Sequence, residues 1–219
     1  MMIFPFWALN LREWGNRINM DQKKSEPDGF PEHLGKMLLA MARNAIAAEL
    51  GGGNLMCNEP SLDTQAHLLE KKMGVFVTLH HHGELRGCIG TLEPVLSLAK
   101  EVVENARHAA FHDPRFPALT QKEFLEISME ISVLTPPRAM AYAGPEDLKK
   151  KLMPGIHGVI LEKHGAKATF LPQVWDQLPE PDLFLEHLCR KAGLASHAWK
   201  DSDIVIQTYT VHSFKEKGF

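Results

Sequence analysis

This chain of 219 residues has few cysteines, no strong excess of charge and no long apolar run. Its three cysteines, Cys57, Cys88 and Cys189, lie far apart and form no CxxC pair. That pattern argues against a disulfide framework or a cysteine-rich zinc site and favours a reducing compartment. The net charge of −3 gives no basic footprint, so we expect no nucleic-acid partner. No stretch reaches the ~20 apolar residues of a membrane helix, so we expect a cytoplasmic protein without membrane contact.

Common nucleotide-binding and nucleophile motifs are also missing. The three glycines that begin at Gly51 are not followed by the Lys-Ser/Thr of a P-loop. No GxGxxG motif follows a strand pattern, and no Gly-x-Ser-x-Gly elbow is present. The sequence therefore indicates no particular cofactor.

The histidines do not converge on a set of metal ligands. His108 and His112 have the spacing of the zinc-protease motif, but Ala109 follows where its general-base glutamate would stand. His80 and His82 would share one face of a strand without a third ligand. Because a protein zinc site needs three or four ligands, we predict no metal site.

Composition and the positions of proline and glycine predict one folded region that follows an N-terminal extension. Hydrophobic residues make up 44% and charged residues 23%, which is ordinary for a globular protein. Residues 21–31 are polar and contain two prolines and a glycine, so 1–31 are interpreted as extension and linker. Residues 32–215 form the domain, either as one unit or as two lobes, about 32–137 and 138–215.

The first nine residues are apolar and aromatic, but they lack the basic start and cleavage site of a signal peptide. Two explanations stay open. The segment docks on the domain or on a partner, or translation starts later, at Met20.

Hydrophobic periodicity predicts alternating groups of strands and helices. Helical patterns cover residues 33–50, a segment that begins at Pro94, a short segment capped by Thr120 and Glu123, and residues 146–152 and 179–192. Strand patterns cover a hairpin at 74–90, a strand at 127–134, a hairpin at 158–171 and a last strand at 203–214. Hairpin, helix and strand thus occur in this order twice. We predict an α+β fold with a mainly antiparallel sheet and packed helices, and the repeated order suggests an internal duplication of a hairpin–helix–strand unit.

The strand that ends the first hairpin contains the most informative residues. Arg86 and Cys88 lie two positions apart, so their side chains are expected on the same face. A guanidinium beside a thiol favours the thiolate, which is the reactive form. Gly87 and Gly90 would let a ligand or another chain approach the backbone. The other interpretation is a buried cysteine that packs as a small hydrophobe.

The segment Leu-Arg-Gly-Cys-Ile-Gly at 85–90 resembles the signature of the AMMECR family, also called AmmeMemoRadiSam system protein A. Further similar blocks follow in order at 112–117, 131–137, 155–159, 170–175 and 189–194. The resemblance implies an AMMECR-type domain over 32–215 and two companions, a Memo-like protein and a radical SAM protein. It also implies a family whose biochemical activity is unsettled.

Our leading hypothesis places the candidate residues around one cleft. Cys88 would be a nucleophile or thiolate ligand, and His157 would be its acid or base. Arg115 would hold an anionic group. Asp113 has an alternative role, because it can form an Asx turn and pair with Arg115. The ligand-binding candidates are Arg86, Gly87, Gly90, Asp113 and Arg115.

Two functions therefore stay open, and the sequence does not decide whether the protein is an enzyme. In the first, the Cys88 cleft binds or modifies a small anionic molecule in a pathway shared with Memo-like and radical SAM proteins. In the second, the chain is a non-enzymatic protein-interaction module that uses a surface groove formed by residues 86–90.

Overall fold

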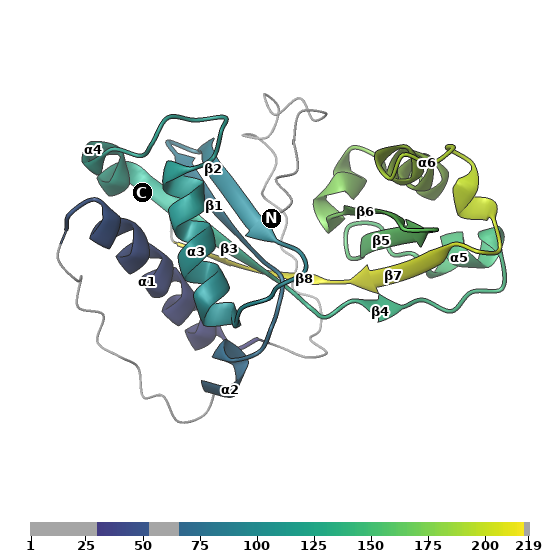
Figure 1. Cartoon of the computed structure of the whole chain (residues 1–219), viewed down its shortest axis with the longest axis horizontal. Coiled ribbons are helices and arrows are strands. Elements are labelled where there is room, and N and C mark those ends of the chain that lie inside the picture. Colours follow the sequence, from purple (N-terminus) through teal and green to yellow (C-terminus); the bar gives the residue numbers. More distant parts are fainter. Residues whose placement is uncertain (1–29, 53–65, 217–219) are drawn as a thin grey trace.

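The computed structural model describes residues 30–52 and 66–216. It has the predicted α+β fold, built on two four-stranded antiparallel sheets that lie next to each other (Figure 1). The N-terminal extension up to residue 29 and Cys57 fall outside the described residues. Within the described ranges, no helix has the length and apolar character needed to cross a membrane.

The first sheet is covered on one face by helices. The elements of this half are α1 (Glu32–Glu49), α2 (Ala66–Leu69), β1 (Val75–His81), β2 (Glu84–Thr91), α3 (Leu98–Phe111), α4 (Gln121–Glu126) and β3 (Ile127–Leu134). The predicted capping box begins α4: the Thr120 hydroxyl accepts a hydrogen bond from the Glu123 backbone N–H, while the Glu123 carboxylate accepts from Thr120.

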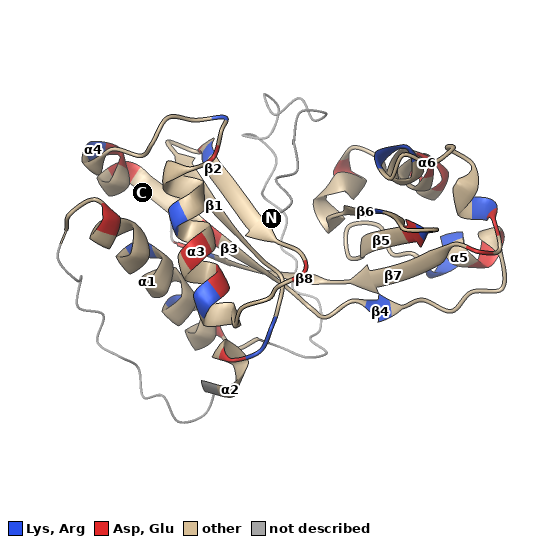
Figure 2. Ribbon diagram, in the orientation of Figure 1, with Lys and Arg blue, Asp and Glu red and all other residues tan. Residues whose placement is uncertain are grey.

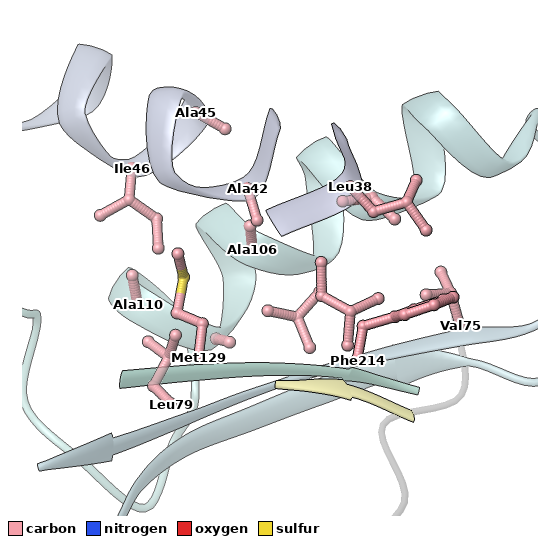
Figure 3. Packing of buried hydrophobic residues seen from close by; sticks show 14 of the residues in the cluster. Leu38, Ala42, Ala45, Ile46, Val75, Leu79, Ala106, Ala110, Met129 and Phe214 are labelled. Atoms are coloured by element: carbon pink, nitrogen blue, oxygen red, sulfur yellow. The ribbon is translucent and has the colours of Figure 1, made fainter. Parts of the chain in front are cut away.

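The core of this half lies between the helices and the sheet (Figure 3). Every second residue of β3 faces it and is at most 1% exposed, which confirms the half-buried strand predicted from the alternation: Ile127, Met129, Ile131 and Val133. The helices contribute Leu38, Ala42 and Ala106 from the opposite side. Small alanines in α1 and α3 let the two helices approach each other above the sheet.

The second half repeats this plan. Its elements are β4 (Arg138–Ala139), α5 (Pro145–Lys151), β5 (Gly158–Lys163), β6 (Ala166–Phe170), the 3-10 helix η2 (Pro172–Asp176), α6 (Pro181–Lys191), the 3-10 helix η3 (Ala198–Lys200), β7 (Val205–Tyr209) and β8 (Val211–Lys215). Trp175 and Trp199 are buried in its core, and Trp175 stacks on Phe184 with ring centroids 3.7 Å apart. Figure 2 shows basic and acidic positions interspersed on both α3 and α6.

The strand orders show the repeat most clearly. The first sheet runs β2-β1-β3-β8, and the second, counted from its hairpin edge, runs β6-β5-β7-β4. In each sheet the hairpin precedes the third strand in the chain, and the fourth strand directly follows a change of sheet: β8 follows β7, and β4 follows β3. The chain therefore passes between the sheets twice, from β3 to β4 and from β7 to β8 (Figure 1).

This crossing corrects one prediction. The single last strand expected at 203–214 is two strands, β7 in the second sheet and β8 in the first. The chain changes sheets at Thr210, whose backbone N–H donates to the Thr135 hydroxyl over 2.9 Å and whose carbonyl accepts from the Thr135 backbone N–H over 3.0 Å. The hydrophobic pattern of residues 203–214 does not reveal the change of sheet, because β7 and β8 each have buried residues.

A small apolar cluster joins the two sheets where the chain crosses. Its buried members are Leu134 at the end of β3, Ile160 in β5 and Tyr209 at the end of β7, and Phe76 of β1 packs against them. The Tyr209 hydroxyl is hydrogen-bonded to the Thr169 hydroxyl at 3.0 Å. The two sheets therefore share apolar contacts as well as strands.

Both hairpins turn through the same dipeptide. His82 and Gly83 link β1 to β2 with φ of 53° and 82°, and His164 and Gly165 link β5 to β6 with φ of 50° and 83°. Two consecutive positive φ values are the mark of a type I′ turn, whose twist matches that of the flanking strands.

Candidate functional site

Arg86 lies at an irregularity in β2. Leu79 of β1 pairs with Gly87 and the next residue, His80, pairs with Leu85, so Arg86 is an extra residue without an opposite partner. Arg86 is 7% exposed and Cys88 is half-buried. The bulge breaks the alternation, so the prediction that these two side chains share a face was wrong.

The Arg86 guanidinium links β2 to the start of α4. Its Nε donates to the Glu123 carboxylate over 2.9 Å, and its Nη2 donates to the Pro117 carbonyl over 2.9 Å. The hydrogen bond from Arg86, supported by the capping contacts of Thr120, lowers the pKa of Glu123 from 4.5 to about 2. The sequence predicts Glu123 as a capping residue, but its second role as the partner of Arg86 joins residues 37 positions apart and is not visible in the local pattern.

The two glycines of the signature permit close packing. A Cβ atom on Gly87 would lie 2.2 Å from the carbonyl oxygen of Ala109 in α3, and one on Gly90 would lie 2.2 Å from the ring of Phe76. Both distances are far below a van der Waals contact. Helix α3 and the Phe76 ring therefore occupy the space that was predicted to admit a ligand or another chain.

Asp113 and Arg115 hold the backbone of Cys88. The Cys88 N–H donates to Asp113 Oδ2 over 2.9 Å, and the Cys88 carbonyl accepts from Arg115 Nη2 over 3.1 Å. Among the described residues β2 is an edge strand, so these hydrogen bonds satisfy backbone groups that could otherwise pair with another strand. We call this arrangement the edge clamp.

The predicted local turn of the clamp is confirmed. Asp113 Oδ1 accepts hydrogen bonds from the Arg115 backbone N–H at 3.1 Å and from Arg115 Nε at 2.9 Å. Burial alone would raise the pKa of Asp113, but the hydrogen bonds from Arg115 and from the Cys88 backbone lower it overall. Asp113 is 3% exposed, so its charge is neutralised inside the fold by Arg115.

The Cys88 side chain lies on the face of the first sheet opposite the helices. Across the strands it is level with Thr78, then Glu130 and then Lys215. The Thr78 hydroxyl donates to Cys88 Sγ over 3.3 Å, and Lys215 pairs with Glu130 at 3.3 Å. We call these four side chains the cross-strand row. Thr78 was seen only as part of a strand pattern, because its position opposite Cys88 depends on the hairpin register.

The environment of Cys88 opposes the predicted thiolate. Burial is the largest influence and raises the pKa of the thiol, while the Thr78 hydrogen bond and the charge of Arg115 lower it by less. Asp113 and Glu130 add negative charge that raises the pKa further. The expectation of a pKa lowered by Arg86 was wrong, because the bulge directs that guanidinium towards Glu123.

His157 is not brought to Cys88. It precedes β5, where its Nδ1 accepts a hydrogen bond from the Met153 N–H over 3.2 Å and its carbonyl accepts from Trp175 Nε1 over 2.8 Å. Burial lowers its pKa. Within the described part of the chain, no hydrogen bond or charge interaction joins His157 to Cys88. His157 orders the loop between α5 and β5, and neither of these hydrogen bonds supports its predicted role as the acid or base of Cys88.

Comparison with known proteins places this fold and its signature in one family. The sequence model of AMMECR1 matches residues 39–214. A protein of Thermofilum pendens is 38% identical over 193 residues, covering 83% of this chain and 89% of its own length. Protein PYRAB00100 of Pyrococcus abyssi is 39% identical over 196 residues, covering 85% and 92%.

A solved structure has the same architecture. The crystal structure of the uncharacterized protein PH0010 from Pyrococcus horikoshii superimposes with a TM-score of 0.69 at 36% sequence identity, covering 86% of this chain and 94% of that one. The match includes both sheets, since it extends over most of each chain. On these grounds the chain belongs to the AMMECR1 family.

Proposed function

We propose that this protein is a non-enzymatic interaction module, and that its natural partner is a Memo-like protein. The observation that carries this proposal is the internal use of the signature's polar groups. Arg86 is paired with Glu123, and Arg115 is paired with Asp113 and the Cys88 carbonyl. The cations expected to hold a small anion already have carboxylate partners, and the thiol expected to react has a raised pKa.

The contact surface of this module differs from the groove first expected at 86–90. Arg86 and Gly87 are buried beneath α3 and α4, so they support the surface from within. The loop that follows β2 is exposed, and in the cross-strand row the Lys215 side chain is 48% exposed. In that loop Val95 is 74% exposed and Leu96 is 38% exposed.

The exposed loop is held in a fixed position. Glu101, which is 4% exposed at the start of α3, accepts hydrogen bonds from the backbone N–H groups of Val95 at 3.2 Å and Leu96 at 3.1 Å. A loop ordered in advance loses less conformational entropy on binding. Exposed apolar side chains held in this way suit the apolar centre of a protein interface.

The family resemblance supplies the partner. Memo-like and radical SAM proteins are its implied companions, and we propose that the module works with both in a shared cytoplasmic pathway. The Memo-like protein is the direct partner in this proposal. The radical SAM protein would join through it.

A pull-down with purified proteins of the same organism tests this. Val95→Asp and Leu96→Asp should weaken capture of the Memo-like protein by about 10-fold or more, because they place a charge in an apolar contact. Leu183→Asp on α6, which replaces a side chain that is 47% exposed, is the matched control and should bind normally. Cys88→Ser should also bind normally.

Two results would overturn the proposal. In one, Cys88→Ser abolishes capture while the loop variants bind like the wild type, which would give Cys88 the direct role. In the other, the wild-type chain does not capture the Memo-like protein. Binding of a small anion that is lost in Arg115→Gln would then favour the first hypothesis.

A further inference from the structure

A cluster of three ligand-type side chains lies at the tip of the first hairpin. His81 ends β1, His82 begins the turn, and Glu126 ends α4. One ligand atom from each residue lies within 4.8 Å of the other two. His81 Nε2 is 3.0 Å from Glu126 Oε2, and His82 Nε2 is 3.4 Å from the same oxygen.

The turn explains why two successive histidines point the same way. In a regular strand, neighbouring side chains lie on opposite faces, so the sequence suggested pairing His80 with His82. His82 instead has a φ of 53°, which rotates its side chain towards His81. The two rings lie 4.1 Å apart, centroid to centroid. The turn therefore places both His81 and His82 near Glu126, although the alternation of a regular strand would put the two histidines on opposite faces.

We infer that His81, His82 and Glu126 form a surface site for a divalent transition metal such as Zn²⁺. With bonds of about 2.0–2.1 Å, the donor atoms of a tetrahedral zinc ion lie roughly 3.3 Å apart. The two distances to Glu126 Oε2, 3.0 and 3.4 Å, are close to that spacing. Imidazole and carboxylate are both common zinc ligands, and three of them leave a fourth position for water or a partner's side chain.

The site is reached from solvent, and one nearby charge opposes it. The His82 side chain is 71% exposed and that of His81 is 26% exposed, so an ion can enter without opening the fold. Lys122 is the charged group of α4 that acts on Glu126, and its positive charge repels a cation. Both features predict an exchangeable site of moderate affinity.

The second hairpin provides an internal comparison. There Lys163 and His164 occupy the places of His81 and His82, because Lys163 pairs with Ala166 across the turn as His81 pairs with Glu84. Asp203 lies two residues before β7 and binds Lys163 at 2.8 Å and His164 at 3.0 Å. An ammonium group has no lone pair to offer a metal. At the tip of the second hairpin the Lys163 ammonium is therefore the cation that Asp203 binds, whereas at the first tip the imidazole of His81 occupies the equivalent position.

Titration calorimetry of the full chain with Zn²⁺ tests the inference. We expect one equivalent that binds more tightly than the rest, and an affinity loss of about 10-fold or more in His82→Asn and in Glu126→Gln. Asparagine tolerates the positive φ of the turn, so His82→Asn removes the ligand without breaking the hairpin. His164→Asn is the matched control and should leave the isotherm unchanged.

A gain-of-function variant provides a second arm. Lys163→His should add a second equivalent, because it gives the second tip the ligand set of the first. The inference is overturned if His82→Asn and Glu126→Gln bind Zn²⁺ like the wild type, or if the tight equivalent is lost only in Cys88→Ser. This site does not depend on partner binding, so its test stands apart from the pull-down.

Discussion

The carboxylate of Asp113 accepts a hydrogen bond of 2.9 Å from the backbone N–H of Cys88, 25 residues earlier in the chain. Arg115 completes the contact by donating to the Cys88 carbonyl. Two segments that look like separate functional motifs are thus one structural unit, an edge strand and the loop that holds it.

Asp113→Asn should destabilise the fold. The variant removes the carboxylate that neutralises Arg115 and puts an amide beside the Cys88 N–H. We expect the free energy of unfolding to fall by about 1–3 kcal/mol, the usual cost of leaving a buried polar group unsatisfied. Urea denaturation measures this. Glu70→Gln, at an exposed position on the same half, should change it by less than about 0.5 kcal/mol, and equal effects would contradict the edge clamp.

Glu123 should make the fold sensitive to acid. Its pKa is lowered from 4.5 to about 2 in the folded chain, so between these pH values the unfolded chain binds a proton that the folded chain does not. The stabilisation is complete above pH 4.5 and is lost as the pH falls towards 2. Thermal melts across this range should show a flatter pH dependence for Glu123→Gln. If the melting temperature of Glu123→Gln depends on pH as steeply as that of the wild type, the ion pair of Glu123 with Arg86 is not the source of the acid sensitivity.

Gly87→Ala should cost more stability than Gly90→Ala. Both added Cβ atoms meet a neighbour at 2.2 Å, but at Gly87 it is the backbone oxygen of Ala109, whereas at Gly90 it is the ring of Phe76. A side chain can rotate, while a helix backbone must move as a unit. We expect about 1–3 kcal/mol or more for Gly87→Ala and a smaller loss for Gly90→Ala. Paired chemical denaturation curves compare them, and the reverse order would be inconsistent with helix α3 packing here.

Thr78→Val should make the Cys88 thiol still less reactive. The hydroxyl donates to Cys88 Sγ, and a hydrogen bond of about 1 kcal/mol corresponds to roughly a fivefold change in acidity. Alkylation of Cys88 at a fixed pH below the thiol pKa should slow by about that factor. Thr208→Val in β7 of the second sheet is the control and should alkylate at the wild-type rate. Faster alkylation of Thr78→Val would contradict the assigned hydrogen bond.

Local patterns in the sequence predicted much of the fold. The alternation from Ile127 to Val133 gave the position of β3, and Thr120 with Glu123 gave the start of α4. The Asx-type turn of Asp113 was also predicted, because both groups that donate to its Oδ1 belong to Arg115, two residues further along the chain. Each of these features depends on neighbours in the chain.

Features that depend on distant residues were missed. The bulge at Arg86 moves that guanidinium away from Cys88, and only the register of β1 against β2 reveals it. The change of sheet at Thr210 depends on Thr135, 75 residues away. The hydrogen bond from Trp175 to the His157 carbonyl joins residues 18 positions apart and was missed for the same reason.

The pH dependence of Cys88 alkylation, followed by mass spectrometry, tests the central claim most directly. We predict an apparent pKa above the value of about 8.5 for a free cysteine, because burial disfavours the thiolate. Such a result supports a packed cysteine on the face of an interaction module. An apparent pKa well below that value would contradict the account and restore Cys88 as a reactive centre.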